Sequence, residues 1–527
     1  MQVSSWIAER LAVPVEFAVF LISSTNFPAG RMFHACGPLF SCRSRAAARL
    51  GAVCAESETG LLEVVFPMQD VPATEEEWTE LEELVSSTSF THPHHMPLRW
   101  HDTIHEPDAI ARDACLEDRC AIIARVGLLT LSGGTGGWRV REAMNRVAQT
   151  LGVVCSADVS LLTIECTCVD GTERETFIVS LPSCGVNTKR IWRMETFLKD
   201  LEACGAGLTV KECHRLMDQI EHDMKGGYTP LQSALASALA CSAFVFLLGG
   251  GAPEMLCAFA GAGVGQYVRR IMGARRITHF ACVAVAVSCA CVSYLLALMA
   301  LGIFDSAALS HEAGYIGAML FVIPGFPLIT SGLDIAKMDF KSGIERLCYA
   351  LTVILVATLF GWLVASIVHL APDDFVPLGI APVPLALMRA AMSFCGVFGF
   401  SIMFSSPLPM AATAGAIGAV ANTLRLELVD LAAVPPEAAA FLGALAAGLI
   451  ASAVRKKLTF PRISLTVPSI VIMVPGLYMY RAIFYLASYN ISDSLTWIVR
   501  AALIVVFLPI GLAAARILTD RHWRYLS

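Results

Sequence analysis

The chain has 527 residues, of which 56% are hydrophobic and only 16% are charged. Soluble domains carry roughly 25% charged residues, so the composition excludes an ordinary soluble protein. The formal net charge of −6 is modest and no basic block is present, so a nucleic-acid partner is not expected. Charged residues are frequent before Tyr228, whereas uncharged segments of membrane length recur after it. We therefore expect a soluble N-terminal portion followed by membrane helices.

Residues 1–117 are expected to form an atypical N-terminal region that is partly a linker. The apolar stretch from Leu11 to Ile22 contains Pro14 and Glu16 and follows no basic segment, so a short buried helix or strand is expected there and a cleavable signal peptide is not. Histidine is a common metal ligand, but the histidines of this region lack a recognisable ligand spacing. A solvated linker without a metal or cofactor is therefore expected. The cluster consists of His92, His94, His95, His101 and His105.

Residues 118–227 are predicted to form a small soluble α+β domain. Apolar residues recur at helical spacing after a glycine-rich stretch, and Asp170-Gly171 is a common hairpin signal between two β-rich segments. The predicted elements are, in order, a helix, a helix at 138–151, strands at 161–168 and 176–180, and helices at 188–203 and 209–224.

The stretch from Ser132 to Gly137 is rich in glycine, as phosphate-binding loops are. It lacks the Gly-Lys-Ser/Thr ending that places a lysine against a phosphate. A turn between two helices is therefore the stronger interpretation of this stretch.

Ten segments after Lys225 have the length and apolar character of membrane spans. A bilayer core of about 30 Å requires around 20 apolar residues in a helix. The second predicted span is short and glycine-rich, and the sixth and tenth contain Arg389 and Arg500. The spans are predicted near 230–250, 253–268, 278–303, 312–333, 346–370, 380–404, 407–425, 436–454, 464–487 and 494–516.

Lysine and arginine are concentrated in alternate loops between these spans. Fourteen fall on the side of the soluble domain, whereas the opposite loops hold only Arg425 and are otherwise acidic. Because cytoplasmic loops carry the excess of Lys and Arg, the soluble domain and both termini are predicted to be cytoplasmic, in an inner membrane. The fourteen residues are Arg269, Arg270, Arg275, Arg276, Lys337, Lys341, Arg346, Arg455, Lys456, Lys457, Arg462, Arg516, Arg521 and Arg524.

The first five spans, in residues 228–372, share landmarks with the last five, in residues 373–527. Gly261-Ala-Gly-Val-Gly265 resembles Gly415-Ala-Ile-Gly418, and Val322-Ile-Pro-Gly325 resembles Met473-Val-Pro-Gly476. The copies are separated by 153 residues at the first landmark and by 151 at the second. Because five is an odd number, the second copy enters the membrane from the opposite side. We therefore predict two inverted five-helix repeats, as in many secondary transporters.

Proline and glycine interrupt one span in each half. A break inside the membrane survives where protein or a water-filled cavity satisfies the exposed backbone. Pro324-Gly325-Phe326-Pro327 and Pro475-Gly476 are therefore predicted to mark a substrate path, with a simple packing kink as the alternative.

Several motifs together resemble the threonine/serine exporter family. Gly127-Leu-Leu-Thr-Leu-Ser-Gly-Gly-Thr135, followed by Arg139-Val-Arg-Glu-Ala-Met-Asn-Arg146, is similar to the start of its soluble domain. The Pro324-Gly325 span with Asp334, Gly343 and Arg346 resembles its first membrane half, and Val474-Pro-Gly-Leu-Tyr-Met-Tyr-Arg481 resembles the signature of its second half. The resemblance covers about residues 118–520. It implies efflux of threonine, serine or a similar small polar amino acid, driven by protons.

Ionisable side chains at membrane depth are functional candidates because their insertion is unfavourable. An amino-acid substrate needs a cation for its carboxylate, which Arg481 could supply, and acceptors for its ammonium group. The residues predicted to line the substrate path are Pro324, Gly325, Pro327, Thr330, Ser331, Asp334, Asn422, Pro475, Gly476, Tyr478 and Arg481.

Three other functions remain open from the sequence. Related proteins are associated with dicarboxylate export, which an arginine-rich cavity would favour. A membrane-anchored hydrolase would need a nucleophile and a base, for which Ser132, His214 and Asp218 are present without a framing motif. The third open function is a sensor. A sensor needs membrane helices only as an anchor, and ten spans with repeated helix breaks are more than an anchor requires. No ATPase signature occurs, which favours secondary transport. The oligomeric state is left open.

Overall fold

The computed structural model describes residues 53–56, 62–65, 98–203, 207–223, 227–455 and 457–524. The chain divides into two compact units, Pro14–Pro97 and Met1–Val13 with Leu98–Ser527. In the smaller unit, β1 (Val53–Glu56) pairs antiparallel with β2 (Leu62–Val65). The predicted apolar segment 11–22 and the first three histidines of the cluster lie outside the described residues.

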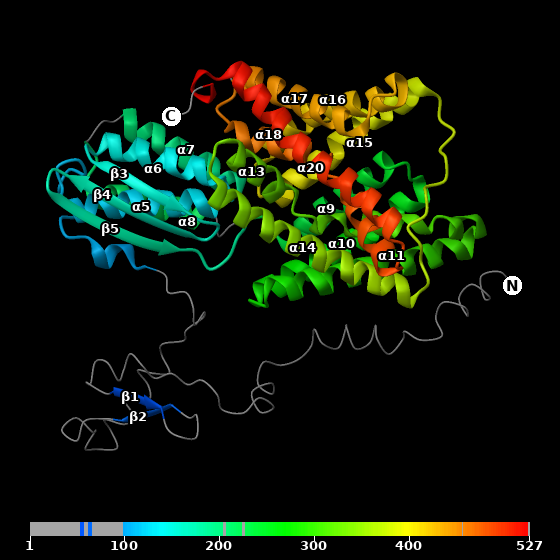
Figure 1. Cartoon of the computed structure of the whole chain (residues 1–527), viewed down its shortest axis with the longest axis horizontal. Helices are drawn as coiled ribbons and strands as arrows, with labels where there is room; N and C mark the ends of the chain where they lie inside the picture. Colours follow the sequence, from blue (N-terminus) through cyan, green and yellow to red (C-terminus); the bar gives the residue numbers. More distant parts are fainter. Residues whose placement is uncertain are drawn as a thin grey trace. The chain divides into compact units, whose positions relative to one another are not determined.

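The larger unit begins with a small α+β domain, shown on the left of Figure 1. Its three strands form one antiparallel sheet in the order β3-β4-β5. The helices and strands are η3 (Trp100–Thr103), α5 (Leu116–Ser132), α6 (Gly137–Thr150), β3 (Val154–Val159), β4 (Thr163–Asp170), β5 (Glu173–Ser180), α7 (Thr188–Ala203) and α8 (Val210–Asp223).

The structure confirms the predicted helices, the turn between α5 and α6, and the β4–β5 hairpin at Asp170-Gly171. It adds β3, which the sequence did not predict. The side chains of β3 that face inward are Cys155, Ala157 and Val159. Two of them are small, so the alternation that marks a half-buried strand is weak there.

Helix α5 is the centre of the soluble core. It is buried on nearly all sides, and most of its residues from Cys120 to Leu131 are apolar. It contacts α6, α7, α8 and two strands. Gly127 on α5 permits this packing, because a Cβ there would lie 2.6 Å from the Met144 sulfur.

The rest of the larger unit is helical (Figure 1). Helix α9 starts at a capping box, in which Thr229 and Gln232 bond each other's backbone N–H, with Pro230 at the first helical position. The helices are α9 (Pro230–Leu247), α10 (Ala252–Ala274), α11 (His279–Phe304), η5 (Ser306–Ser310), η6 (Glu312–Gly314), α12 (Tyr315–Met319), η7 (Leu320–Val322), α13 (Gly325–Ala336), α14 (Phe340–Ile367), α15 (Pro382–Met403), α16 (Leu408–Ala432), α17 (Pro436–Arg455), α18 (Arg462–Val471), α19 (Gly476–Ala487), α20 (Ile491–Thr519) and η8 (Arg521–Trp523).

Within the described residues, six helices are long and apolar enough to cross a membrane: α9, α11, α14, α15, α17 and α20. Two bent pairs raise the number to eight if each pair is one span. Residues 312–322 and α13 meet at 57°, and α18 and α19 meet at 48°. The chain is thus a multi-pass membrane protein with six to eight candidate spans, against about ten predicted. The second and seventh predicted spans are helices, α10 and α16, but charged side chains such as Glu254 and Glu427 lower their hydropathy.

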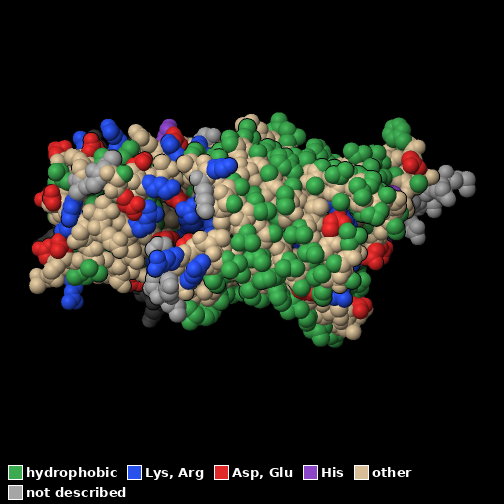
Figure 2. Space-filling model, turned by 90° about the horizontal axis from the view of Figure 1, so that it is seen from above, with side chains coloured by type: hydrophobic (Ala, Val, Ile, Leu, Met, Phe, Trp, Pro, Cys, Tyr) green, Lys and Arg blue, Asp and Glu red, His purple; other side chains and the backbone are tan. Residues whose placement is uncertain are grey.

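The surface of the helical part agrees with its assignment as a membrane-spanning region. Figure 2 shows hydrophobic side chains covering the helical part, with Lys and Arg gathered where it meets the soluble domain. Apolar side chains that are more than half exposed would be unfavourable in water but suit contact with lipid. They include Leu256, Leu355, Val383, Leu387, Val420 and Val506.

The two membrane halves have matching helix contacts. In the first half, α9 packs on α10, α10 on α11, and α11 on α14. In the second half, α15 packs on α16, α16 on α17, and α17 on α20. The two halves also contact each other, since α14 packs on α19 and α13 packs on α20. Helices at equivalent positions therefore have equivalent neighbours.

Candidate functional site

The helix breaks of the two halves have the same backbone geometry. Pro324 has φ −80° and ψ 61°, and Pro475 has φ −81° and ψ 54°. In each break the glycine N–H donates to the carbonyl two residues earlier, at 2.8 Å in both cases. These are inverse γ-turns with proline at the centre. Both halves interrupt a helix in the same way at positions 151 residues apart.

The two breaks lie against each other in the buried core. A Cβ added at Gly325 would lie 3.2 Å from Val471 and 3.3 Å from Val474. A Cβ added at Gly476 would lie 2.8 Å from Leu320 and 3.5 Å from Ile323. The contacts are reciprocal, because Val471 and Val474 follow Leu320 and Ile323 by the same 151 residues. Such exchange of contacts is the signature of a two-fold relation.

We expect a side chain at Gly476 to destabilise this contact. Overpacking costs typically about 1–3 kcal/mol, so Gly476→Val should lower the thermal midpoint of the purified protein and slow transport. Gly273→Val is the matched control, because a Cβ at Gly273 meets nothing within 4 Å. Equal midpoints for the two variants would contradict the tight contact.

A cavity of about 580 Å³ opens beside the second break. The end of α9, the loop 374–380 and helices α15, α16, α19 and α20 contribute to its wall. Helix α9 begins near the soluble domain and runs about 27 Å at 1.5 Å per residue, so the cavity lies toward the far end of the helices. The predicted site residues that line it are Asn422, Pro475, Gly476, Tyr478 and Arg481.

Three arginines line the cavity, and two of them are neutralised by acidic side chains. Arg389 pairs with Glu427 and Asp430. Arg481 donates to Asp374 at 2.7 Å, and its guanidinium lies over the Trp497 ring.

The third arginine has a different environment. Arg425 donates to a backbone carbonyl, Met473 O, at 3.3 Å. None of the carboxylates that the structure describes forms an ion pair with it. Arg425 was assigned to a loop from the sequence, but α16 continues to Ala432 and places it in the cavity wall.

Asn422 lies one helical turn before Arg425 on the same helix. Its side-chain N–H donates to Ser393 Oγ at 2.9 Å, whereas its buried side-chain oxygen has no hydrogen-bond partner among the residues that the structure describes. The first half has a corresponding pair, in which Gln266 donates to Ser233 at 2.9 Å. Asn422 and Arg425, three residues apart on α16, thus both line the cavity.

The other predicted site residues lie away from the cavity. Pro324, Gly325 and Pro327 belong to the first break and its following turn, and Gly325 lines a narrow space of about 20 Å³ against Gly476. Thr330 and Ser331 are buried and donate to carbonyls of their own helix, α13. The hydroxyl hydrogens of both residues are therefore used within the helix, and neither residue lines the cavity.

Asp334 is fully buried where the membrane helices meet the soluble domain. Its Oδ2 accepts from Gly137 N and Ser342 Oγ, both at 3.2 Å, and lies 3.5 Å from Arg346 Nε. Arg346 in turn donates to Gly134 O at 3.2 Å. The glycine-rich turn between α5 and α6 thus docks onto α13 and α14. Asp334 and Arg481 were predicted as parts of one path, but the structure does not bring them together.

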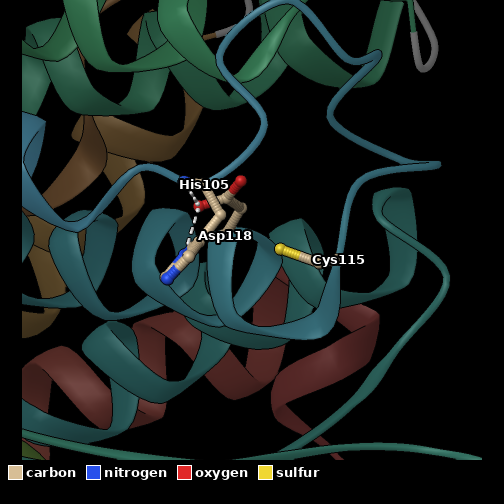
Figure 3. Close-up of side chains that lie close together, drawn as sticks. All are labelled: His105, Cys115 and Asp118. Atoms are coloured by element: carbon tan, nitrogen blue, oxygen red, sulfur yellow. Dashed lines mark hydrogen bonds and ion pairs between the residues drawn. The ribbon is translucent and has the colours of Figure 1, made fainter.

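A possible metal-ligand group lies in the soluble domain (Figure 3). The ligand atoms of His105, Cys115 and Asp118 are within 4.8 Å of one another. However, the Asp118 carboxylate accepts the backbone N–H groups of His105 and Glu106, at 3.0 and 2.8 Å. Burial raises the pKa of the Cys115 thiol, which disfavours the thiolate that binds metals. The group therefore anchors the loop before α5.

The residues of the hydrolase alternative do not form a catalytic set. Ser132 Oγ donates to Leu129 O and accepts from Arg190, both at 2.7 Å. His214 is buried with its Nδ1 against Arg125, and burial together with that positive charge lowers its pKa to about 4. Among the described residues, no hydrogen bond joins Ser132 to His214.

Paired helix breaks beside a polar cavity, in a multi-pass membrane protein, define the transporter class. Comparison with protein families then specifies which one. The family described as "Putative threonine/serine exporter" matches residues 121–368, and "Threonine/Serine exporter, ThrE" matches residues 389–518. The chain belongs to the threonine/serine exporter family, in the fused form that carries both membrane halves. Comparisons with curated proteins and with solved structures gave no match. Family membership implies a transporter and not an enzyme.

Proposed function

We propose that the protein exports threonine, serine or a similar small polar amino acid from the cytoplasm, as a secondary transporter that uses protons. The observation that carries this proposal is the adjacency of Arg425 and Asn422 in the cavity. An amino-acid zwitterion needs a cation for its carboxylate and an acceptor for its ammonium group. Arg425 has no carboxylate partner among the described residues, and the Asn422 side-chain oxygen has no donor among them, so the two residues could meet both needs.

Arg425 is preferred over Arg481 as the carboxylate ligand. Arg481 would have to leave Asp374 before it could bind a substrate, whereas Arg425 would give up only a bond to a carbonyl. Arg481 and Tyr478 are proposed to complete the wall of the binding site near the second break.

We further propose ten membrane helices arranged as two inverted five-helix repeats. The matching breaks, the reciprocal contacts between them and the equivalent helix neighbours support this arrangement. The proposed divisions are an N-terminal region 1–117, a cytoplasmic domain 118–227, a first repeat 228–372 and a second repeat with the tail, 373–527.

The location of the basic residues supports cytoplasmic termini in the inner membrane. Cytoplasmic loops carry the excess of Lys and Arg. One basic residue from each of four predicted inner segments contacts the soluble domain or its boundary: Arg270 with Tyr228, Lys341 with Asp158, Arg455 with Glu195, and Arg516 with Trp138.

Dicarboxylate export is the second candidate, because three arginines line the cavity. Among the residues that the structure describes, carboxylates pair with Arg389 and Arg481, which leaves Arg425 as the cation for one substrate carboxylate. One such cation suits an amino acid, which has one backbone carboxylate, better than a dicarboxylate, which has two.

Efflux from loaded cells tests the proposal. Cells are loaded with a threonine-containing dipeptide, and release of threonine is compared with and without the protein. We expect faster release with the protein, and no change in a parallel succinate measurement. Threonine release at the same rate in both strains would refute amino-acid export, and faster succinate release alone would establish the second candidate.

A further inference from the structure

A buried carboxylate and an imidazole pair in the first membrane half. Glu254, near the start of α10, is 1% exposed. Its Oε1 lies 2.5 Å from His311 Nδ1, in the segment between η5 and η6. The His311 side chain is 19% exposed, so the pair is reached from outside the protein although the carboxylate itself is buried.

The pair lies at the far end of the helices from the soluble domain. Helix α9 leaves the soluble domain and ends at Leu247, shortly before Glu254. Under the proposed orientation, this end faces the outside of the cell. A proton arriving from outside would therefore meet His311 first.

The partner of this carboxylate is an imidazole. Among the described residues, His311 is the ion-pair partner of Glu254, and no lysine or arginine is. Among the described residues, Cys257 on α10 and Tyr294 on α11 interact electrostatically with Glu254, and Glu312 on η6 interacts with Tyr294. With a neutral imidazole the pair carries one negative charge, and one added proton held between Oε1 and Nδ1 brings it to zero.

The surroundings hold the pair in a fixed position. Tyr294 donates its hydroxyl to His311 O at 2.6 Å. A Cβ at Gly314 would collide with the Tyr294 hydroxyl and lie 2.8 Å from Glu254 Cβ. The segment that carries His311 therefore has little room to move while Glu254 and Tyr294 stay in place.

The second carboxylate oxygen connects the pair to the cavity wall. Glu254 Oε2 accepts from Gly251 N at 2.9 Å. A Cβ at Gly250 would lie 3.3 Å from Phe375, and one at Gly251 would lie 3.7 Å from Leu378. Phe375 and Leu378 line the cavity. A change in the charge of Glu254 thus acts on a hydrogen bond that positions the cavity wall.

We propose that Glu254 and His311 form the proton-binding site of the transporter, with Glu254 coupling its occupancy to the cavity through residues 249–251. This inference rests on the proposed function. In each cycle one proton would bind the pair from outside and leave to the cytoplasm, while one substrate molecule moves outward. The protein returns to its starting protonation state.

Assays on reconstituted full-length protein can measure proton coupling and substrate movement separately. Proteoliposomes are tested in two assays, exchange of radiolabelled threonine at equal pH and threonine accumulation driven by an acidic interior. Glu254→Gln keeps an oxygen that can accept from Gly251 but cannot carry the charge. We expect near wild-type exchange and at least about a tenfold loss of accumulation. His311→Gln should behave in the same way.

Asp305→Asn is the matched control, because Asp305 is an exposed carboxylate that caps η5 through Ala307 N. It should exchange and accumulate like wild type. Wild-type accumulation by both Glu254→Gln and His311→Gln would overturn the inference. Loss of exchange together with accumulation, in protein with a wild-type thermal midpoint, would also overturn it by assigning the pair to substrate transit. Absence of exchange in the wild type would instead refute the proposed substrate.

Discussion

Replacing Arg425 with glutamine should lower threonine export at least about tenfold, while the protein still inserts in the membrane. A hydrogen bond to a charged group contributes about 1.5–3 kcal/mol, and 1.4 kcal/mol corresponds to a tenfold change in binding. The loss arises because Arg425 is the cavity arginine without a carboxylate partner among the described residues. Efflux of threonine from dipeptide-loaded cells measures it.

Arg500→Gln is the matched control for this experiment. Arg500 is exposed and lies over the Trp497 ring, but it is not among the cavity-lining residues. Its replacement should leave export unchanged. Arg425→Lys keeps the charge without the planar fork and should retain part of the activity. Export at the wild-type rate from Arg425→Gln would exclude Arg425 as the substrate ligand.

Asp334→Asn should abolish export for a different reason, the loss of docking between the soluble domain and the membrane helices. Removing one partner of a buried charge pair typically costs about 3–5 kcal/mol, because the other charge remains buried. Here the remaining charge is that of Arg346, which is 1% exposed. We expect faster amide exchange in the α5–α6 turn, measured by mass spectrometry, together with loss of efflux.

A double variant distinguishes this effect from a direct role in transport. Asp334→Asn with Arg346→Gln removes both charges, so docking and part of the export should return. A double-mutant cycle then gives the coupling between the two residues. Wild-type efflux from Asp334→Asn, or a double variant no better than the single one, would contradict the docking role.

The sequence predicted the parts of this molecule that depend on local pattern. Proline and glycine interrupt apolar runs at Pro324 and Pro475, and the structure breaks both helices there. Hydropathy likewise located the long helices. Hydropathy was less informative for α10 and α16, which carry charged residues near their ends. A helix can continue past a charged residue that has an ion-pair partner, and Glu427 on α16 pairs with Arg389.

Contacts between distant segments could not be predicted in the same way. Glu254 and His311 are 57 residues apart, and no sequence motif around either residue predicts that the two form a pair. Asp334 is at membrane depth by sequence position, yet its partner is the N–H of Gly137 in the soluble domain. Whether a polar side chain faces a cavity or an interface is decided by tertiary packing, which a single sequence does not encode locally.

The two helix breaks are separated by apolar side chains from both halves of the chain, with room between them for little more than one water molecule. Such an apolar barrier opposes the passage of a hydrated ion, because apolar side chains do not replace its water. Under the proposed function, this barrier would limit ion leakage while no substrate is being exported.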